Sequence, residues 1–194
     1  MAASKKFSLP FPGRALADRE LTYDLCYERI PKQDRARIVE DAWQCGCQAA
    51  RDAYERFDGC TDFFSVFEQT GVKVRERDVD YVVGGQRYFS DYLSGKKTVT
   101  LYTKAVALWA EENGLAMRDA ENMILSHEFY HHLECTELGL TSRRYQVPML
   151  QLGPVKLGKT GIKALSEIGA HAFVRTYFTC AGLLGKEGKH GKNA

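Results

Sequence analysis

The chain has 194 residues, of which 44% are hydrophobic and 27% are charged. This composition is typical of a globular protein and excludes a disordered or collagen-like chain. The 27 basic and 25 acidic residues give a net charge of +2, so we expect no direct binding to nucleic acid or to a membrane. No apolar run reaches the ~18 residues of a membrane-spanning helix, and the start of the chain lacks the apolar core of a secretion signal. We therefore expect a cytoplasmic protein.

The two ends of the chain differ in composition from the middle. Residues 1–32 contain three prolines, and we predict an N-terminal arm there, with one short helix near Leu21–Glu28. Residues 186–194 are basic and glycine-rich, and we predict a disordered tail. Residues 33–185 are expected to form a single domain. Its cysteines are expected to be reduced thiols, as in most cytoplasmic proteins.

The first half of this domain changes from helical to strand periodicity. Apolar residues recur every three or four positions from Asp34 to Phe57, which predicts a helix, and a shorter helix is expected over Asp62–Gln69. Alternating apolar and polar residues, separated by glycine turns, predict strands at 72–83, 87–94 and 98–103. The expected fold class is α+β, with helices packed on a small, mostly antiparallel three-stranded sheet.

The second half of the domain is predicted to be helical. We expect helices over residues 105–112, 119–138 and 161–180. Residues 140–160 contain Pro148, Pro154 and several glycines, and they are expected to form a long loop. We find no internal repeat.

The most informative segment is S-H-E-F-Y-H-H at residues 126–132. His127 and His131 are four residues apart, so on a helix their imidazoles lie on one face and can bind one metal ion. Glu128 lies beside the pair and can reach a water on that metal. This is the H-E-x-x-H arrangement of zinc peptidases, in which the glutamate is the general base.

A catalytic zinc usually has a third protein ligand. Six residues were considered for it: His132, Glu134, Cys135, Glu137, Glu167 and His171. His132 points about 100° away from His131 on a helix. Cys135 continues the same row, and three ligands along one straight helix cannot converge on one ion. The last helix offers Glu167, with His171 four residues later and small residues between them, so Glu167 completes a set of two histidines and one glutamate.

The pair of motifs H-E-F-Y-H at 127–131 and E-I-G-A-H-A-F at 167–173 resembles the ImmA/IrrE family of metallopeptidases. The resemblance covers about residues 34–182 and implies a minimal zincin-like domain with gluzincin-like chemistry. It assigns His127, His131 and Glu167 to one Zn²⁺ and Glu128 to the base, and it gives His171 no role. It also implies a protein substrate, in some members a transcriptional repressor.

The sequence leaves three further points open. The donor that stabilises the oxyanion is sought among His171, Tyr130, Tyr145 and Arg143. The strand at 98–103 is expected either to offer an edge for an extended peptide substrate or only to pack in the core. A set of two histidines and one glutamate also accepts Mn²⁺ or Fe²⁺.

The main functional hypothesis is a zinc endopeptidase. The alternative is a non-catalytic, zinc-stabilised module that binds a protein or peptide, for example one encoded by a phage or mobile element. A fourth ligand, from Cys135 or His171, would favour that alternative. A third hypothesis is an interaction protein of a phage or a toxin–antitoxin system that contacts its partner through the N-terminal arm and the basic tail.

Overall fold

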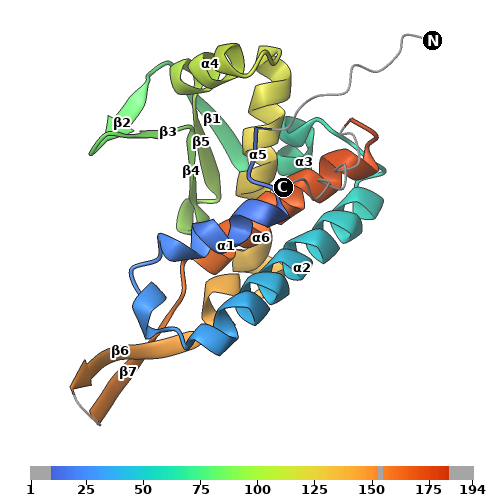
Figure 1. Ribbon diagram of the computed structural model, residues 1–194. Coiled ribbons are helices and arrows are strands. Elements are labelled where there is room, and N and C mark those ends of the chain that lie inside the picture. The colour runs from blue at the N-terminus through green and yellow to red at the C-terminus, as the bar shows by residue number, and fades with distance from the viewer. Residues whose placement is uncertain (1–9, 153–154, 184–194) are drawn as a thin grey trace, which may run out of the picture.

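The computed structural model describes residues 10–152 and 155–183 and shows a mixed α+β fold (Figure 1). The described helices are α1 Arg14–Thr22, α2 Lys32–Arg56, α3 Phe63–Gln69, α4 Thr103–Glu112, α5 Met117–Leu133 and α6 Ala164–Cys180. The described strands are β1 Lys73–Arg77, β2 Tyr81–Val83, β3 Gln86–Tyr88, β4 Ser90–Leu93, β5 Thr98–Tyr102, β6 Gln146–Leu152 and β7 Val155–Gly161. Within these residues, no helix has both the length and the apolarity needed to cross a membrane.

Strand β5 is the centre of a three-stranded sheet with the order β1-β5-β4. Strand β4 pairs with β5 antiparallel, as expected of a mostly antiparallel sheet, whereas β1 pairs with β5 in parallel. The predicted strand at 72–83 is divided between β1 and β2, and the strand at 87–94 between β3 and β4. Strands β2 and β3 form a separate hairpin, whose turn residues Gly84 and Gly85 both have positive φ, as a tight two-residue turn requires.

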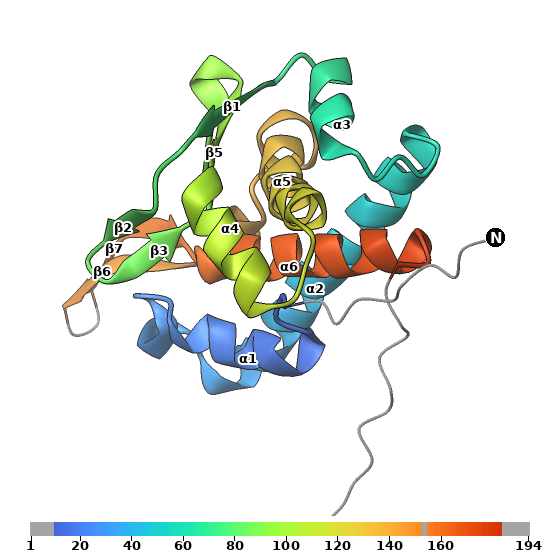
Figure 2. The ribbon, with the colours of Figure 1, turned by 90° about the horizontal axis from the view of Figure 1, so that it is seen from above.

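Helix α5 lies between the sheet and helix α6, which runs beside the long helix α2 (Figures 1 and 2). Large side chains from α3, α5 and α6 form the main core, in which Phe63, Phe129 and Tyr177 are fully buried. A second core lies between α1, α2 and α6 and includes Leu21, Trp43 and Ile168. The predicted helices at 34–57, 62–69, 105–112 and 161–180 are confirmed within a few residues.

The N-terminal helix lies earlier than the expected Leu21–Glu28. Helix α1 covers Arg14–Thr22 and packs against α2 and α6 through the buried side chains of Ala17 and Leu21. The chain then turns, because the Asp24 carboxylate accepts hydrogen bonds from the backbone N–H groups of Cys26 (2.8 Å) and Ala164 (3.0 Å). Residues 14–30 are therefore part of the packed fold rather than an arm. The predicted tail at 186–194 lies outside the described residues.

The expected loop at 140–160 is wrong, because strands β6 and β7 form an antiparallel hairpin there. Pro148 obscured this strand in the sequence, since proline is rare inside a sheet. In a two-stranded hairpin every strand has a free edge, so the missing N–H is tolerated. The hairpin extends away from the helices (Figure 1) and exposes Met149, Leu150 and Leu157.

Glycines allow helices α2, α5 and α6 to approach closely. A Cβ atom at Gly46 would lie 2.0 Å from the backbone oxygen of Gly169, and one at Gly169 would lie 2.3 Å from the Tyr130 hydroxyl. Both distances are far inside van der Waals contact, so no larger residue fits without moving a helix. The crossing of α5 and α6 sets the separation of the side chains on their facing sides.

We predict that Gly46→Ala lowers the free energy of unfolding by about 1–3 kcal/mol, the usual cost of overpacking. Elsewhere in a helix, replacing glycine by alanine raises the free energy of unfolding by about 0.5–1 kcal/mol. A decrease at Gly46 would therefore indicate the close contact between the helices. Urea denaturation of the purified protein measures the change. The matched control is Gly95→Ala, where an added Cβ meets no atom within 4 Å and the change is expected to stay within about 0.5 kcal/mol. A stabilised Gly46→Ala variant would contradict the packing.

Candidate metal centre

Helix α5 carries the two histidines of the H-E-x-x-H motif near its C-terminal end. The Nε2 atoms of His127 and His131 face each other at 3.2 Å. At this distance at least one nitrogen has to be unprotonated, because two facing N–H groups would repel each other. The helix was expected to continue to Leu138, but after Leu133 the last turn widens into a π-helix at Glu134–Leu138 and ends at Gly139, whose φ is +72°.

Helix α6 brings Glu167 to this pair. Its Oε2 lies 3.3 Å from His127 Nε2, and its Oε1 lies 3.6 Å from His131 Nε2. Ligands held at 2.0–2.1 Å around a tetrahedral zinc are about 3.4 Å apart. The three separations of 3.2, 3.3 and 3.6 Å therefore fit one divalent cation without a change of backbone. The structure brings together the three residues that the sequence suggested as ligands.

Glu134 contacts His131 on the side of the ring opposite the nitrogen that faces the cluster. Its Oε2 lies 2.9 Å from His131 Nδ1, while its Oε1 accepts hydrogen bonds from the Thr141 N–H (2.7 Å) and the Ser166 hydroxyl (2.8 Å). A carboxylate on Nδ1 holds the ring in the tautomer whose Nε2 lone pair faces the cluster, as is usual for metal-binding histidines. From the sequence, Glu134 was expected only as a possible ligand. Its position three residues after His131 was the signal for this supporting role.

For His131 and Glu167, hydrogen bonds and opposite charges shift the pKa more than burial does. Burial alone lowers the pKa of His131, but the Glu134 hydrogen bond and the carboxylates of Glu167 and Glu128 raise it to about 9. Burial raises the pKa of Glu167, yet the hydrogen bond and charge of His127 bring it down to about 2. His171 behaves differently, because burial and the charge of His127 lower its pKa to about 3. The cluster therefore holds ionised carboxylates at neutral pH, as a metal site requires.

Glu128 lies next to the cluster without joining it. Its Oε1 accepts a 2.6 Å hydrogen bond from the hydroxyl of Ser90 on strand β4. This contact fixes the carboxylate between α5 and the edge of the sheet. Ser90 could not be predicted from the sequence, because its approach to Glu128 depends on the order of the strands.

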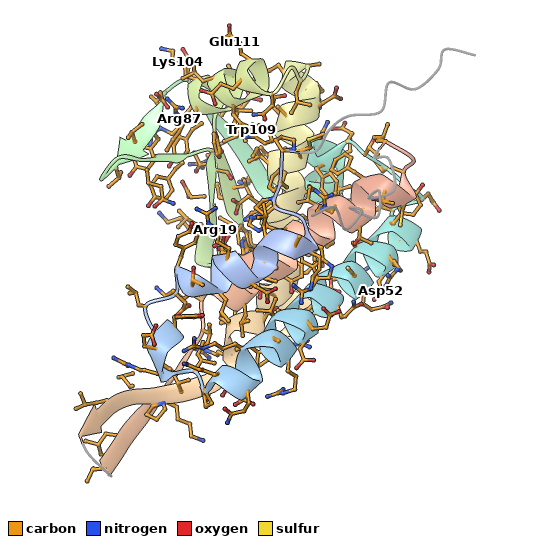
Figure 3. All side chains as sticks on the ribbon, in the orientation of Figure 1. Arg19, Asp52, Arg87, Lys104, Trp109 and Glu111 are labelled. Carbon is orange, nitrogen blue, oxygen red and sulfur yellow. The ribbon has the colours of Figure 1, made fainter. Side chains whose placement is uncertain are left out.

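The cluster opens into a cleft of about 770 Å³. Strands β3 and β4, helix α1 and the chain preceding α1 line the cleft together with α5 and α6. One end is aromatic, with Phe11, Phe89 and Trp109 in contact. Figure 3 shows Trp109 on the inner side of α4, whereas Lys104 and Glu111 point away from the molecule. Polar side chains, including Glu20, Ser90 and Ser166, also line the cleft.

His171 is the one donor suggested from the sequence that lies in the cleft beside the ligands. The ligand atoms of His127, Glu167 and His171 all lie within 4.8 Å of one another. Its ring centroid is 5.5 Å from that of His127 and 5.9 Å from that of Phe11.

The other suggested donors lie outside the cleft, and these suggestions are corrected. The Tyr130 hydroxyl is buried against α6 and lies 2.6 Å from Thr141 Oγ1. The Tyr145 hydroxyl donates a 2.7 Å hydrogen bond to Asp34 near the start of α2, and Arg143 is exposed on a short turn. Their loop and core positions follow from tertiary packing that a motif does not encode.

The remaining ligand candidates are also accounted for. His132 faces the sheet, where its Nδ1 lies 2.9 Å from the Tyr92 hydroxyl. Glu137 forms an ion pair with Arg56 on α2. Cys135 is exposed and lines the cleft, but no ligand cluster within the described chain includes it.

Comparisons of this chain with protein-family models, with curated proteins and with solved structures give no match. The functional argument therefore depends on the residues of the site.

We predict that Glu134→Gln lowers the affinity for Zn²⁺ by about 10–100-fold. The glutamine oxygen can still accept from Thr141 and Ser166, but its NH₂ group then faces His131 Nδ1. This favours the tautomer with the proton on Nε2, which cannot bind a metal. Competition with a chromophoric chelator measures the change. The control Glu137→Gln removes a carboxylate from the same turn, outside the cleft, and unchanged affinity is expected; equal losses in both variants would refute the assigned role.

We predict that zinc affinity rises with pH and levels off above about pH 9. The free site holds its extra proton on His131, whose pKa is about 9, and Zn²⁺ has to displace that proton. Below pH 9 the logarithm of the affinity should rise by about one per pH unit. The same competition assay at pH 7, 8, 9 and 10 checks this. An affinity independent of pH would show that His131 binds no proton in the free site or is not a ligand.

Proposed function

We propose that this protein is a zinc-dependent endopeptidase that hydrolyses peptide bonds of a protein substrate. The observation that carries the proposal is the approach of His127, His131 and Glu167 to within 3.6 Å of one another, in an open cleft that also contains Glu128. A cluster that served only the fold would not need a further carboxylate beside it, outside the ligand set, in a cleft of this size.

The chain supplies the groups that such a hydrolysis needs. When bound, Zn²⁺ would lower the pKa of a water and polarise the substrate carbonyl. Glu128 is the proposed general base, which accepts a proton from the attacking water and delivers it to the leaving amine. The Ser90 hydroxyl orients the carboxylate through its 2.6 Å hydrogen bond. His171, whose pKa is lowered by burial, is neutral at pH 7 and lies in the cleft, so while it is not bound to the metal it can serve as the oxyanion donor.

The proposed peptide-binding edge is strand β4 rather than the strand at 98–103. Strand β5 is paired on both sides, so it offers no free edge. Strand β4 is the outer strand of the sheet, and its alternate residues Ser90 and Tyr92 line the cleft. An extended peptide that pairs with β4 would pass next to Glu128.

The resemblance of the two motifs to ImmA/IrrE metallopeptidases supports the same proposal. On that basis we propose a zincin-like domain, a single Zn²⁺ and a transcriptional regulator as the protein substrate. Any effect on DNA would then act through this partner. A cytoplasmic location belongs to the same proposal.

A non-catalytic module that binds a protein or peptide is the second candidate. It is favoured by the position of His171, whose ligand atom lies within 4.8 Å of those of His127 and Glu167. A fourth protein ligand is typical of structural zinc sites.

We predict that Glu128→Gln retains bound zinc but lowers the rate of peptide cleavage by about 10²–10⁴-fold, the usual contribution of a general base. Labelling of new N-termini in a proteome-derived peptide pool, followed by mass spectrometry, measures cleavage. Zinc content is measured on the same samples.

Glu137→Gln is the matched control, because it changes a glutamate outside the cleft and should leave the cleavage products unchanged. Equal cleavage by the parent and Glu128→Gln would remove Glu128 as the base. If the zinc-loaded parent produces no new N-termini in the pool or in a partner captured by Glu128→Gln, the binding module is favoured.

A further inference from the structure

We infer that His171 is a fourth protein ligand, so that the centre holds its metal with three imidazoles and one carboxylate. This inference rests on the metal-binding part of the proposed function and extends it to a residue that the H-E-x-x-H motif does not include. It concerns the ligand set, and it can be tested without measuring peptide cleavage.

The helix geometry supports this ligand set. Glu167 and His171 are four residues apart on α6, as His127 and His131 are on α5. Each helix therefore presents two side chains, one turn apart, on the face that meets the other helix. The close crossing at Gly169, which lies between Glu167 and His171, brings the two pairs together. Four donors from two crossing helices can surround one ion.

The distances agree with a single centre. The ligand atoms of His127, Glu167 and His171 all lie within 4.8 Å of one another. His131 adds its Nε2 at 3.2 Å from His127 and 3.6 Å from Glu167. His127 and Glu167 therefore lie close to His131 on one side and to His171 on the other, so an ion that they bind is near all four side chains.

The His171 ring has no competing polar partner. Within the described chain, no hydrogen bond or ion pair engages its nitrogens. The Phe11 ring packs against both His171 and His127, with centroid distances of 5.9 and 6.0 Å. An aromatic ring positions the imidazoles but takes no hydrogen bond of ordinary strength from them. The ring is partly exposed and lines the cleft, so its nitrogens are accessible to a metal ion bound there.

The fourth ligand affects how the centre can work. With four protein ligands, all tetrahedral positions are filled. Catalysis then needs a fifth position or the departure of one ligand, whereas a structural centre needs neither. His171 is the ligand most easily spared, because the other three already form the set expected of a catalytic zinc.

The test counts the bound imidazoles in the cobalt(II)-substituted protein. Each coordinated histidine gives one strongly shifted N–H proton in the NMR spectrum, and the buried Nδ1 of His127 protects its proton from exchange. Three such signals are expected for the parent and two for His171→Gln. The zinc affinity of His171→Gln should also fall by more than the about 10–100-fold caused by losing an outer partner.

His132→Gln and His190→Gln are the controls, and each should retain three signals. Two signals in the parent, or loss of the third in either control, would overturn the inference while leaving the two-histidine centre intact. Extended X-ray absorption fine structure of the zinc-loaded parent gives a second count of the imidazole ligands, and this count does not depend on whether His171→Gln folds. A parent that binds no metal would refute the proposed function as well, whereas three signals without peptide cleavage would refute only the peptidase.

Discussion

The close crossing of helices α5 and α6 is the constraint on which the site depends. Gly169 lies against the Tyr130 ring, and Gly46 on α2 lies against the Gly169 backbone. The Tyr130 hydroxyl is engaged with Thr141 at 2.6 Å, so it forms part of the packing beneath the site. Without these small residues the helices would separate by the width of a side chain, and Glu167 would no longer reach the imidazoles on α5.

The charge balance of the cleft is the second constraint. Glu128, Glu134 and Glu167 line it together, and burial and the nearby Glu167 raise the pKa of Glu20 on α1. In the metal-free protein the proton on His131 offsets only part of this negative charge. A divalent cation at the cluster would offset more of it and would pair with the carboxylate of Glu167. The surplus of carboxylates is thus consistent with a cation site.

The sequence predicted the parts of the site that depend on local spacing. His127, His131, Glu167 and His171 follow helical periodicity, so their faces could be inferred before their distances were known. The positions of Ser90 and Phe11 could not be inferred, because they depend on strand order and on the path of the chain before α1. The same holds for the two tyrosines: Tyr130 points into the core, and Tyr145 is bound to Asp34 near the start of α2.

The fold shows the same division between local and non-local information. Most helices were predicted, since their apolar periods are clear. The β6–β7 hairpin was missed because Pro148 and the glycines interrupt its alternation, and the parallel pairing of β1 with β5 was missed because it depends on contacts distant in sequence. Asp24 explains the misplaced N-terminal helix, since its carboxylate caps two backbone groups, one of them on α6.

The most direct test of whether His127, His131 and Glu167 bind one zinc ion is anomalous diffraction at the zinc absorption edge, from crystals grown with Zn²⁺. We expect one strong peak within bonding distance of His127 Nε2, His131 Nε2 and the Glu167 carboxylate. A peak elsewhere on the chain, or Glu167 turned away from an ion held by the histidines alone, would contradict it.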